Sequence, residues 1–257
     1  MNRHEFASLF DLTGRTAVIT GGTRGIGRAI AEGFVLAGAN VVVASRKPDS
    51  CSATAQALRD MGGEALGVPT HLGELDQLAN LVERSVDRFG GIDILVNNAA
   101  TGLTMPIESI TVEAWNKSFD VNLRGPVFLA NAALPHLIAS EHAAILNVIS
   151  VGGVSHAPTQ AMYAAAKAAL LTFTRNTAAE WASYGVRVNA LAPGTVRTDM
   201  LRGLGEDGVA RVANISFQKR VAEPDEMVGP ALFLCSDASS YVTGQMLVAD
   251  GGYVVAR

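Results

Sequence analysis

The sequence predicts an α/β fold: a doubly wound parallel sheet of about seven strands, with helices on both faces, in a single domain over residues 1–257. Short β-branched runs alternate with longer helical patterns almost from end to end. Most of these runs are apolar on both faces, and a glycine-rich turn follows the first of them. With 257 residues, of which 49% are hydrophobic and 17% charged, the chain can bury one large core.

Each expected strand is a run of four to seven residues that helices must cover on both sides. Two of the runs, 65–68 and 246–249, are weaker than the rest. The seven expected strands cover residues 16–20, 41–44, 65–68, 93–97, 144–150, 186–191 and 246–249. The first expected helix covers residues 25–37, with Ile26, Ile30 and Phe34 on one stripe and Gly38 at its end.

The longest stretch without a regular pattern covers about residues 192–216. Loops of that length in compact domains are usually functional lids, so we expect this one to border the site. Its apolar side chains indicate either an apolar part of a ligand or packing of the lid itself; they are Met200, Leu201, Leu204, Val209 and Val212.

Composition excludes several classes of function. The net charge is -4 with no run of Lys and Arg, so nucleic acid is not an expected partner. Cys51 and Cys235 are isolated and the five histidines lack ligand spacing, so we expect neither disulfides nor a metal. No secretory signal or membrane-spanning run is present, and we expect a cytoplasmic protein with a small-molecule partner.

The turn TGGTRGIG (20–27) lies between the first strand and the first helix. Glycines there allow positive φ and a close approach of the backbone to a pyrophosphate, whose charge the helix N-terminus stabilises. The strand, turn, helix and second strand fall where a dinucleotide site needs them, which favours a Rossmann-type fold over a simple tight turn.

A tyrosine and a lysine lie one helical turn apart in YAAAK (163–167). Positions i and i+4 share a face, so Tyr163 and Lys167 can point into one cleft. A nearby ammonium favours the phenolate, so we expect it to lower the pKa of Tyr163 and make it a general acid and base. Ser150 ends a strand, where its hydroxyl can donate to a substrate oxygen. The alternative is a packing tyrosine and a solvated lysine.

The spacing of Gly21, Gly25 and Gly27, followed in order by NNAA (97–100), the serine, YAAAK and PG (193–194), resembles the short-chain dehydrogenase/reductase (SDR) family over nearly the whole chain. The resemblance implies an NADP(H)-dependent oxidoreductase that interconverts a carbonyl and a secondary alcohol. It implies a catalytic role for Asn122, Ser150, Tyr163 and Lys167, with Asn122 supporting a water path from Lys167; capping of backbone groups is the alternative for Asn122.

The resemblance also implies which residues contact the dinucleotide. Ala100 replaces the glycine of the family's NNAG motif, and His71 replaces an aspartate near the adenine. The Pro193–Gly194 pair could instead be a plain turn. The implied cofactor-binding residues are Gly21, Thr23, Arg24, Gly25, Ile26, Gly27, Ser45, Arg46, His71, Leu72, Asn98, Ala99, Tyr163, Lys167, Pro193, Gly194, Val196 and Thr198.

The end of the second strand favours NADP(H) over NAD(H), which remains possible. NAD enzymes usually place an acid there, about 20 residues past the glycine turn. Here Ser45, Arg46 and Lys47 hold that place, and the first acid is Asp49. A 2′-phosphate would meet Arg46 and, from the other side, Arg24.

Two other functions stay open. A 3-oxoacyl thioester (acyl-carrier-protein or coenzyme A) reductase is one, although Glu141 and Tyr184 fall where carrier-protein reductases commonly place basic residues. A dinucleotide-binding regulator without catalysis is the other, and the serine, tyrosine and lysine argue against it. The resemblance implies a homotetramer built on the helix at about 160–182, whose Ala164, Ala165, Ala168, Leu171 and Phe173 exceed what one sheet contact needs. His156 is expected in a surface loop or at the substrate mouth.

Overall fold

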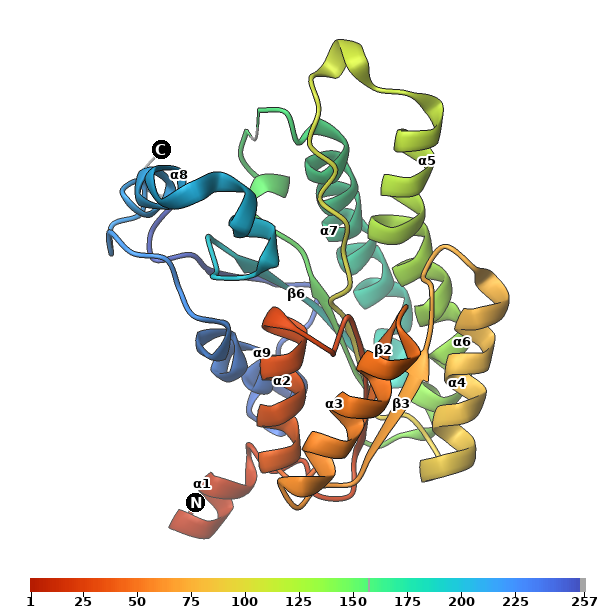
Figure 1. The fold of residues 1–257 in the computed structure, drawn as a ribbon. Coiled ribbons are helices and arrows are strands. Elements are labelled where there is room, and N and C mark those ends of the chain that lie inside the picture. The colour runs from red at the N-terminus through yellow and green to blue at the C-terminus, as the bar shows by residue number, and fades with distance from the viewer. Residues whose placement is uncertain (157, 255–257) are drawn as a thin grey trace.

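One parallel sheet of seven strands, in the order β3-β2-β1-β4-β5-β6-β7, forms the centre of the computed structural model (Figure 1), which describes residues 1–156 and 158–254, without the side chains of 202–204. This confirms the expected fold class and single domain. The strands are β1 (Thr16–Thr20), β2 (Asn40–Ser45), β3 (Ala65–Pro69), β4 (Ile94–Asn97), β5 (Ala144–Val148), β6 (Arg187–Pro193) and β7 (Met246–Ala249).

The helices connect the strands by crossovers that keep all neighbouring strands parallel. The α-helices are α1 (Arg3–Ser8), α2 (Gly25–Leu36), α3 (Pro48–Asp60), α4 (Leu75–Phe89), α5 (Val112–Phe119), α6 (Gly125–Ala139), α7 (Ala161–Trp181), α8 (Gly205–Ala213) and α9 (Val228–Cys235). Shorter 3-10 and π segments are η1 (Ile107–Ser109), η2 (Asp120–Arg124), η3 (Val151–Gly153), η4 (Ala182–Tyr184), η5 (Asp199–Leu204), η6 (Pro224–Met227) and η7 (Asp237–Ser239).

Two apolar layers cover the sheet, one on each face. Because side chains alternate along a strand, Ile19 packs with α2, α3 and α9, whereas its neighbour Val18 packs with α4, α6 and α7. Figure 1 shows α2 and α9 on one side of the sheet and α4 and α6 on the other. Strands buried in this way must be apolar on both faces, which is the pattern that predicted them.

β1 and β7 have the expected bounds, and the ends of the other strands differ from the expectation by at most two residues. The fifth strand ends at Val148 instead of residue 150, although the Ile149 N–H still donates to the Leu191 carbonyl at 2.8 Å. The sixth strand continues to Pro193, where its register pairs Pro193 with Ala249 of β7. Pro193 is therefore a strand residue and not part of a plain turn.

The expectation of an irregular stretch at 192–216 was wrong. Its first residues belong to β6, and η5 and α8 occupy most of the rest. Gly205 with φ 64° separates the two helical segments, and the glycines in α8 obscure its helical pattern in the sequence. The side chain of Leu204 lies outside the described part of the structure.

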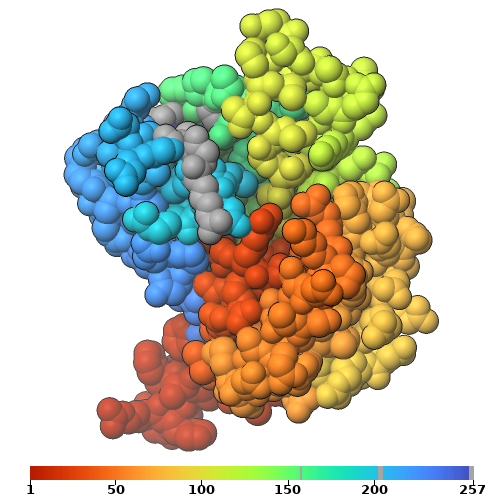
Figure 2. Space-filling model, viewed as in Figure 1, coloured from red at the N-terminus to blue at the C-terminus, as the bar shows by residue number. Residues whose placement is uncertain are grey.

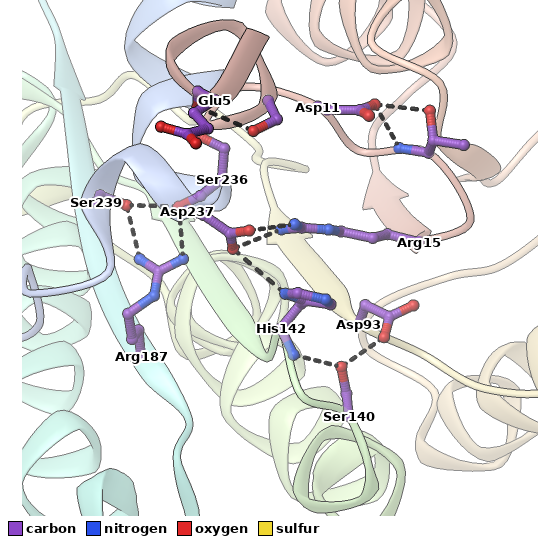
Figure 3. A network of polar contacts seen from close by, with 12 residues as sticks. Glu5, Asp11, Arg15, Asp93, Ser140, His142, Arg187, Ser236, Asp237 and Ser239 are labelled. Carbon is purple, nitrogen blue, oxygen red and sulfur yellow. Dashed lines mark hydrogen bonds and ion pairs between the residues drawn. The ribbon is translucent and has the colours of Figure 1, made fainter. Parts of the chain in front are cut away.

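A polar network lies near the amino ends of β1, β4 and β6, opposite the glycine turn (Figure 3). The Asp237 carboxylate accepts two hydrogen bonds from Arg15 at 3.0 and 2.6 Å and lies 3.3 Å from His142 Nδ1. Arg187 donates to the carbonyls of Leu234 and Ser236 and to Ser239 Oγ. The network joins the N-terminus of β1 to the segment that follows α9.

We expect Asp237→Asn to destabilise the protein by about 2 kcal/mol at pH 7, because it leaves the buried Arg15 guanidinium without its anion. Burial raises the pKa of Asp237, but the hydrogen bonds and charge of Arg15, with His142, outweigh it and the pKa is lowered. A lowered carboxyl pKa stabilises above the unfolded value, about 4, and this contribution is lost as pH falls through the folded value. Thermal unfolding at several pH values should show the gap between wild type and variant closing below about pH 4.

Asp225→Asn is the control, since Asp225 is exposed on η6. A gap of the same size at pH 3 and pH 7 would contradict the role given to the Arg15–Asp237 pair.

In the ranges 1–156 and 158–254 no helix is long and apolar enough to cross a membrane, and no group of three or more potential metal ligands occurs in that part of the chain.

Candidate active site

The glycine turn has the positive φ values that the sequence predicted, and it packs closely against the residues after β4. Gly21 and Gly25 have φ values of 66° and 53°, in the left-handed region. A Cβ atom on Gly27 would lie 2.3 Å from Asn98 Nδ2 and 2.4 Å from the Gly21 carbonyl oxygen, so only glycine fits. The N-cap residue of α2, Arg24, makes no side-chain capping bond. The first amides of α2 therefore have no side-chain cap, which suits an anion.

Thr20 and Asn98 hold the glycine turn against the end of β4. Thr20 Oγ1 accepts hydrogen bonds from the N–H groups of Asn98 and Ala99 at 3.0 and 3.1 Å. Asn98 Nδ2 donates to the carbonyls of Thr20 and Gly21 at 2.9 and 3.3 Å. Sequence reasoning missed Thr20, although its place as the last residue of β1, before the glycines, could have indicated it. Ala100, where the family has glycine, is not among the residues with positive φ.

The other residues of the turn, Thr23 and Ile26, are half-buried, and Ile26 packs on the core beneath α2. At the end of β2, Ser45 accepts from the Thr70 N–H through its carbonyl at 2.8 Å, and the exposed Arg46 follows it. The Cys51 thiol donates to the same Ser45 carbonyl at 3.3 Å.

After β3, His71 and Leu72 lie near this edge. The His71 N–H donates to Gln77, and His71 Nδ1 accepts from the Gly73 N–H at 3.1 Å. The imidazole therefore supports its own loop, while Leu72 is buried in the core on the α4 and α6 face. The structure places the backbone of both residues beyond the end of β3, beside the end of β2.

The segment after β6 turns toward the glycine turn. A Cβ atom on Gly194 would lie 2.7 Å from Asp250, and Val196 is buried and bridges to Ala222. A Cβ atom on Gly25 would lie 3.1 Å from the Thr198 methyl group. Thr198 therefore lies beside the glycine turn.

Arg24, in the glycine turn, contacts an acidic residue of the segment after β6. Its guanidinium forms an ion pair with Asp199 at 3.0 Å, and its side chain remains 70% exposed. The pair joins the glycine turn to η5 at the start of the segment that we expected to be a lid. Exposed pairs of this kind are weak, so Arg24 can exchange Asp199 for a phosphate at little cost.

Ser150, Tyr163 and Lys167 come together at the carboxyl edge of the sheet. Ser150 precedes η3 directly after β5, and Tyr163 and Lys167 lie one turn apart on α7. The Ser150 hydroxyl lies close enough to Tyr163 to act on its pKa. Lys167 Nζ donates to the Val148 carbonyl at 2.8 Å and lies 5.8 Å from the centre of the Tyr163 ring. Tyr163 and Lys167 are buried, which excludes a solvated lysine.

Burial sets the protonation of this pair. It raises the pKa of Tyr163, and the hydrogen bond with Ser150 lowers it by a smaller amount. It lowers the pKa of Lys167 to about 8, because the ammonium loses its hydration. The expectation of a lowered pKa for Tyr163 was therefore wrong: burial dominates, and the phenol stays neutral.

Asn122 lies in the π-helical segment η2, between α5 and α6, and is fully buried. Its Oδ1 accepts from the Thr101 N–H at 3.0 Å, and its Nδ2 donates to the Thr101 carbonyl at 2.9 Å. The carboxamide thus holds the loop after β4, as the backbone-capping alternative described. Such a π turn is frequent at functional sites, and η2 packs against α7, which carries Tyr163 and Lys167.

Two loops and the segment after β6 surround this edge. A Cβ atom on Gly102 would lie 3.3 Å from Met200 Cε, and the Met105 N–H donates to the Thr159 carbonyl at 2.8 Å. In the space-filling view, the cyan and blue C-terminal segments lie at the left and the yellow segment after β4 lies at the upper right (Figure 2). His156 is exposed in the loop before α7.

Comparisons with known proteins identify dehydrogenases and reductases as relatives of the chain. A family model described as Enoyl-(Acyl carrier protein) reductase matches residues 21–254. The chain is similar to cis-4-hydroxycyclohexanecarboxylate dehydrogenase of Sinomonas cyclohexanicum, with 38% identity over 93% of this chain and 96% of the relative. It is 36% identical to a 3-oxoacyl-[acyl-carrier-protein] reductase of Synechocystis, over 95% of this chain and 98% of the relative.

Among solved structures, it resembles a gluconate 5-dehydrogenase of Burkholderia cenocepacia J2315 in complex with NADP and tartrate. The TM-score is 0.94 at 36% identity, covering 98% of this chain and all of that chain.

Proposed function

Because the chain belongs to the short-chain dehydrogenase/reductase family and is an oxidoreductase acting on alcohol or carbonyl groups, we propose that it uses NADP(H) to interconvert a small carbonyl compound and a secondary alcohol. The carrying observation is that Ser150 and the neutral Tyr163 come together with the Lys167 ammonium, one turn away, at the sheet edge beside the glycine turn. A dinucleotide-binding regulator without catalysis would not need these three groups together.

The site fits a dinucleotide on its own geometry. The first amides of α2 lack a side-chain cap, and Thr20 and Asn98 hold the glycine turn in place. The strand order reverses between β1 and β4, which are neighbours in the sheet although β2 and β3 separate them in the sequence. Ligands of open α/β sheets bind at such switch points. When bound, NADP(H) supplies the hydride.

The chain's own residues would orient the carbonyl and move the proton. Ser150 Oγ donates a hydrogen bond to the substrate oxygen, and the neutral Tyr163 hydroxyl donates its proton to that oxygen as negative charge develops there. The nearby Lys167 ammonium stabilises the tyrosinate that remains. In alcohol oxidation the same groups act in reverse.

The substrate would be small and at least partly apolar. Met200 approaches Gly102 across the edge, and we propose that the segment around η5 and α8 acts as the lid. An acyl thioester is the second candidate, favoured by the family model and by the Synechocystis relative. Glu141 and Tyr184 are both exposed, and neither offers a positive charge to an acidic carrier protein. A coenzyme A thioester does not need a positive surface that docks a carrier protein.

The test follows NADPH oxidation against diketones, cyclic ketones, keto acids, quinones and acyl thioesters, with the matching alcohols assayed in the other direction. We expect turnover of a free carbonyl or alcohol. Turnover of carrier-protein thioesters alone would establish the second candidate, and cofactor binding without turnover of any of these compounds would support the regulator.

We further propose a cytoplasmic homotetramer. Trp115 on α5, Phe128 on α6 and Phe173 on α7 are each more than 40% exposed, and a groove of about 300 Å³ lies between α6 and α7. Such aromatic surface favours association. Of the residues expected at the contact, Leu171 is buried within the chain, whereas Ala165 and Phe173 are exposed.

We expect a mass near four times 26.8 kDa by light scattering at micromolar concentration. Phe173→Glu on the exposed face should shift the mass toward smaller species, because a buried unpaired charge opposes helix pairing. A wild-type monomer would rule the assembly out.

A further inference from the structure

A buried row of polar side chains crosses from β4 to the helix that carries Tyr163 and Lys167. Asn97 Nδ2 donates to Asn147 Oδ1 at 2.9 Å, and Asn147 Nδ2 donates to Thr174 Oγ1 at 2.9 Å. The Thr174 hydroxyl then donates to the Leu170 carbonyl at 2.8 Å. All three side chains are buried. We call Asn97, Asn147 and Thr174 the Asn97 chain.

Two backbone carbonyls fix the direction of donation along the hydrogen bonds of the Asn97 chain, because a carbonyl oxygen can only accept a hydrogen bond. At one end the Thr174 hydroxyl gives its hydrogen to Leu170, so its oxygen accepts from Asn147. At the other end Asn97 Nδ2 also donates to the Pro126 carbonyl at 3.4 Å. The Asn97 amide group therefore faces Asn147 and Pro126, and its Oδ1 faces away from them.

Asn97 Oδ1 is the buried side-chain atom left without a donor in the part of the chain that the structure describes. Buried acceptors without a donor are rare and costly in native proteins, and ordered water commonly supplies the missing hydrogen bond. Asn122, which also lies near this edge, already has partners in Thr101 and Ser118.

A donor lies at the same end of the β4–β5 pair. Asn97 and Asn147 are the last register partners of the two strands, and Val148 follows Asn147. The Ile149 N–H points toward β6, so the Val148 carbonyl, which belongs to the same peptide group, points the opposite way, toward β4. Lys167 Nζ donates a hydrogen bond to this carbonyl. An ammonium has three hydrogens, and among the described residues Val148 is the acceptor found for it.

Few charged groups lie near the Lys167 ammonium. Tyr163, on α7 itself, is the titratable neighbour of Lys167. The segment η2, packed against α7, carries Asp120 and Arg124, which pair with each other at 3.2 Å. Strands β4 and β5 contribute no charged residue, and from η3 the backbone of Gly153 approaches Lys167.

We propose that a buried water molecule lies between Asn97 and Lys167, donating a hydrogen bond to Asn97 Oδ1 and accepting one from Lys167 Nζ. Asn97 is then a positioning residue: it holds the water that hydrates the ammonium, and so helps Lys167 to stay protonated at neutral pH. The catalytic role of that ammonium rests on the proposed function, whereas the water site does not.

The test uses the fact that the chain has four lysines, 47, 117, 167 and 219. In protein labelled with [¹³Cε]lysine, four signals can be titrated by NMR, and the one missing from Lys167→Met belongs to Lys167. Asn97→Leu should lower the titration midpoint of that signal by about one pH unit, because it removes the acceptor that fixes the water. The matched control, Thr174→Val, breaks the Asn97 chain at its other end and should shift the midpoint by less than about 0.3 unit.

An unchanged midpoint in folded Asn97→Leu would overturn the proposal. So would equal shifts in the two variants, since they would indicate a displacement of α7. Should Asn97→Leu fail to fold, a high-resolution crystal structure of the wild type decides: a water within about 3.2 Å of both atoms is expected, and its absence refutes the site. Neither measurement needs turnover, so a failure of the proposed function would appear separately in the substrate panel.

Discussion

Replacing Tyr163 with phenylalanine should lower turnover at least roughly 100-fold. The change removes one hydroxyl, which lies beside Ser150 and is the proposed proton donor to the substrate oxygen. The ring stays in its buried position on α7, so the fold should be retained. Steady-state kinetics with a verified substrate, together with a fluorescence titration of NADPH, separates chemistry from binding. The dissociation constant of NADPH should change little, by roughly threefold at most.

Tyr184→Phe is the matched control, because Tyr184 is exposed in η4, beyond the end of α7. It should retain wild-type turnover. If Tyr163→Phe kept most of its activity, the proton would have to come from another group, and the mechanism drawn from Ser150, Tyr163 and Lys167 would be incorrect.

The strands of this fold were predictable because burial on both faces leaves a continuous apolar run. Ile19 and its neighbour Val18 pack on opposite layers, and both had to be apolar. The segment η5–α8 was not predictable in the same way. It lies at the surface, where a helix needs no apolar run, and Gly205 interrupts its pattern.

The candidate site was predictable where a residue acts through its place in a motif. Tyr163 and Lys167 lie together because i and i+4 share a helix face. Protonation was not predictable, because it depends on desolvation: burial keeps Tyr163 neutral and lowers the pKa of Lys167 to about 8. Nor could the sequence show that Asn122 would be held by Thr101, or Arg24 by Asp199, since these contacts join distant segments.

The wild type should prefer NADPH to NADH by roughly 100-fold in kcat/KM, if two charge-assisted contacts to a 2′-phosphate each contribute about tenfold. No acidic side chain ends β2, where an enzyme that prefers NAD would bind the ribose hydroxyls. Arg46 follows directly after β2 and is exposed to solvent. Arg24 lies in the glycine turn, and its exposed pair with Asp199 can open to meet the phosphate.

Arg46→Asp should lose most of this preference, because it removes one contact and places a carboxylate where it repels the phosphate and accepts from ribose hydroxyls. Arg24→Gln should lose about tenfold and leave NADH turnover unchanged. The control is Arg84→Asp on the exposed face of α4, which makes the same change in net charge away from the site. The measurement is kcat/KM with NADPH and NADH on one substrate for all four proteins. Equal use of both cofactors by the wild type, or equal losses in Arg46→Asp and Arg84→Asp, would refute the assignment of the 2′-phosphate to Arg46.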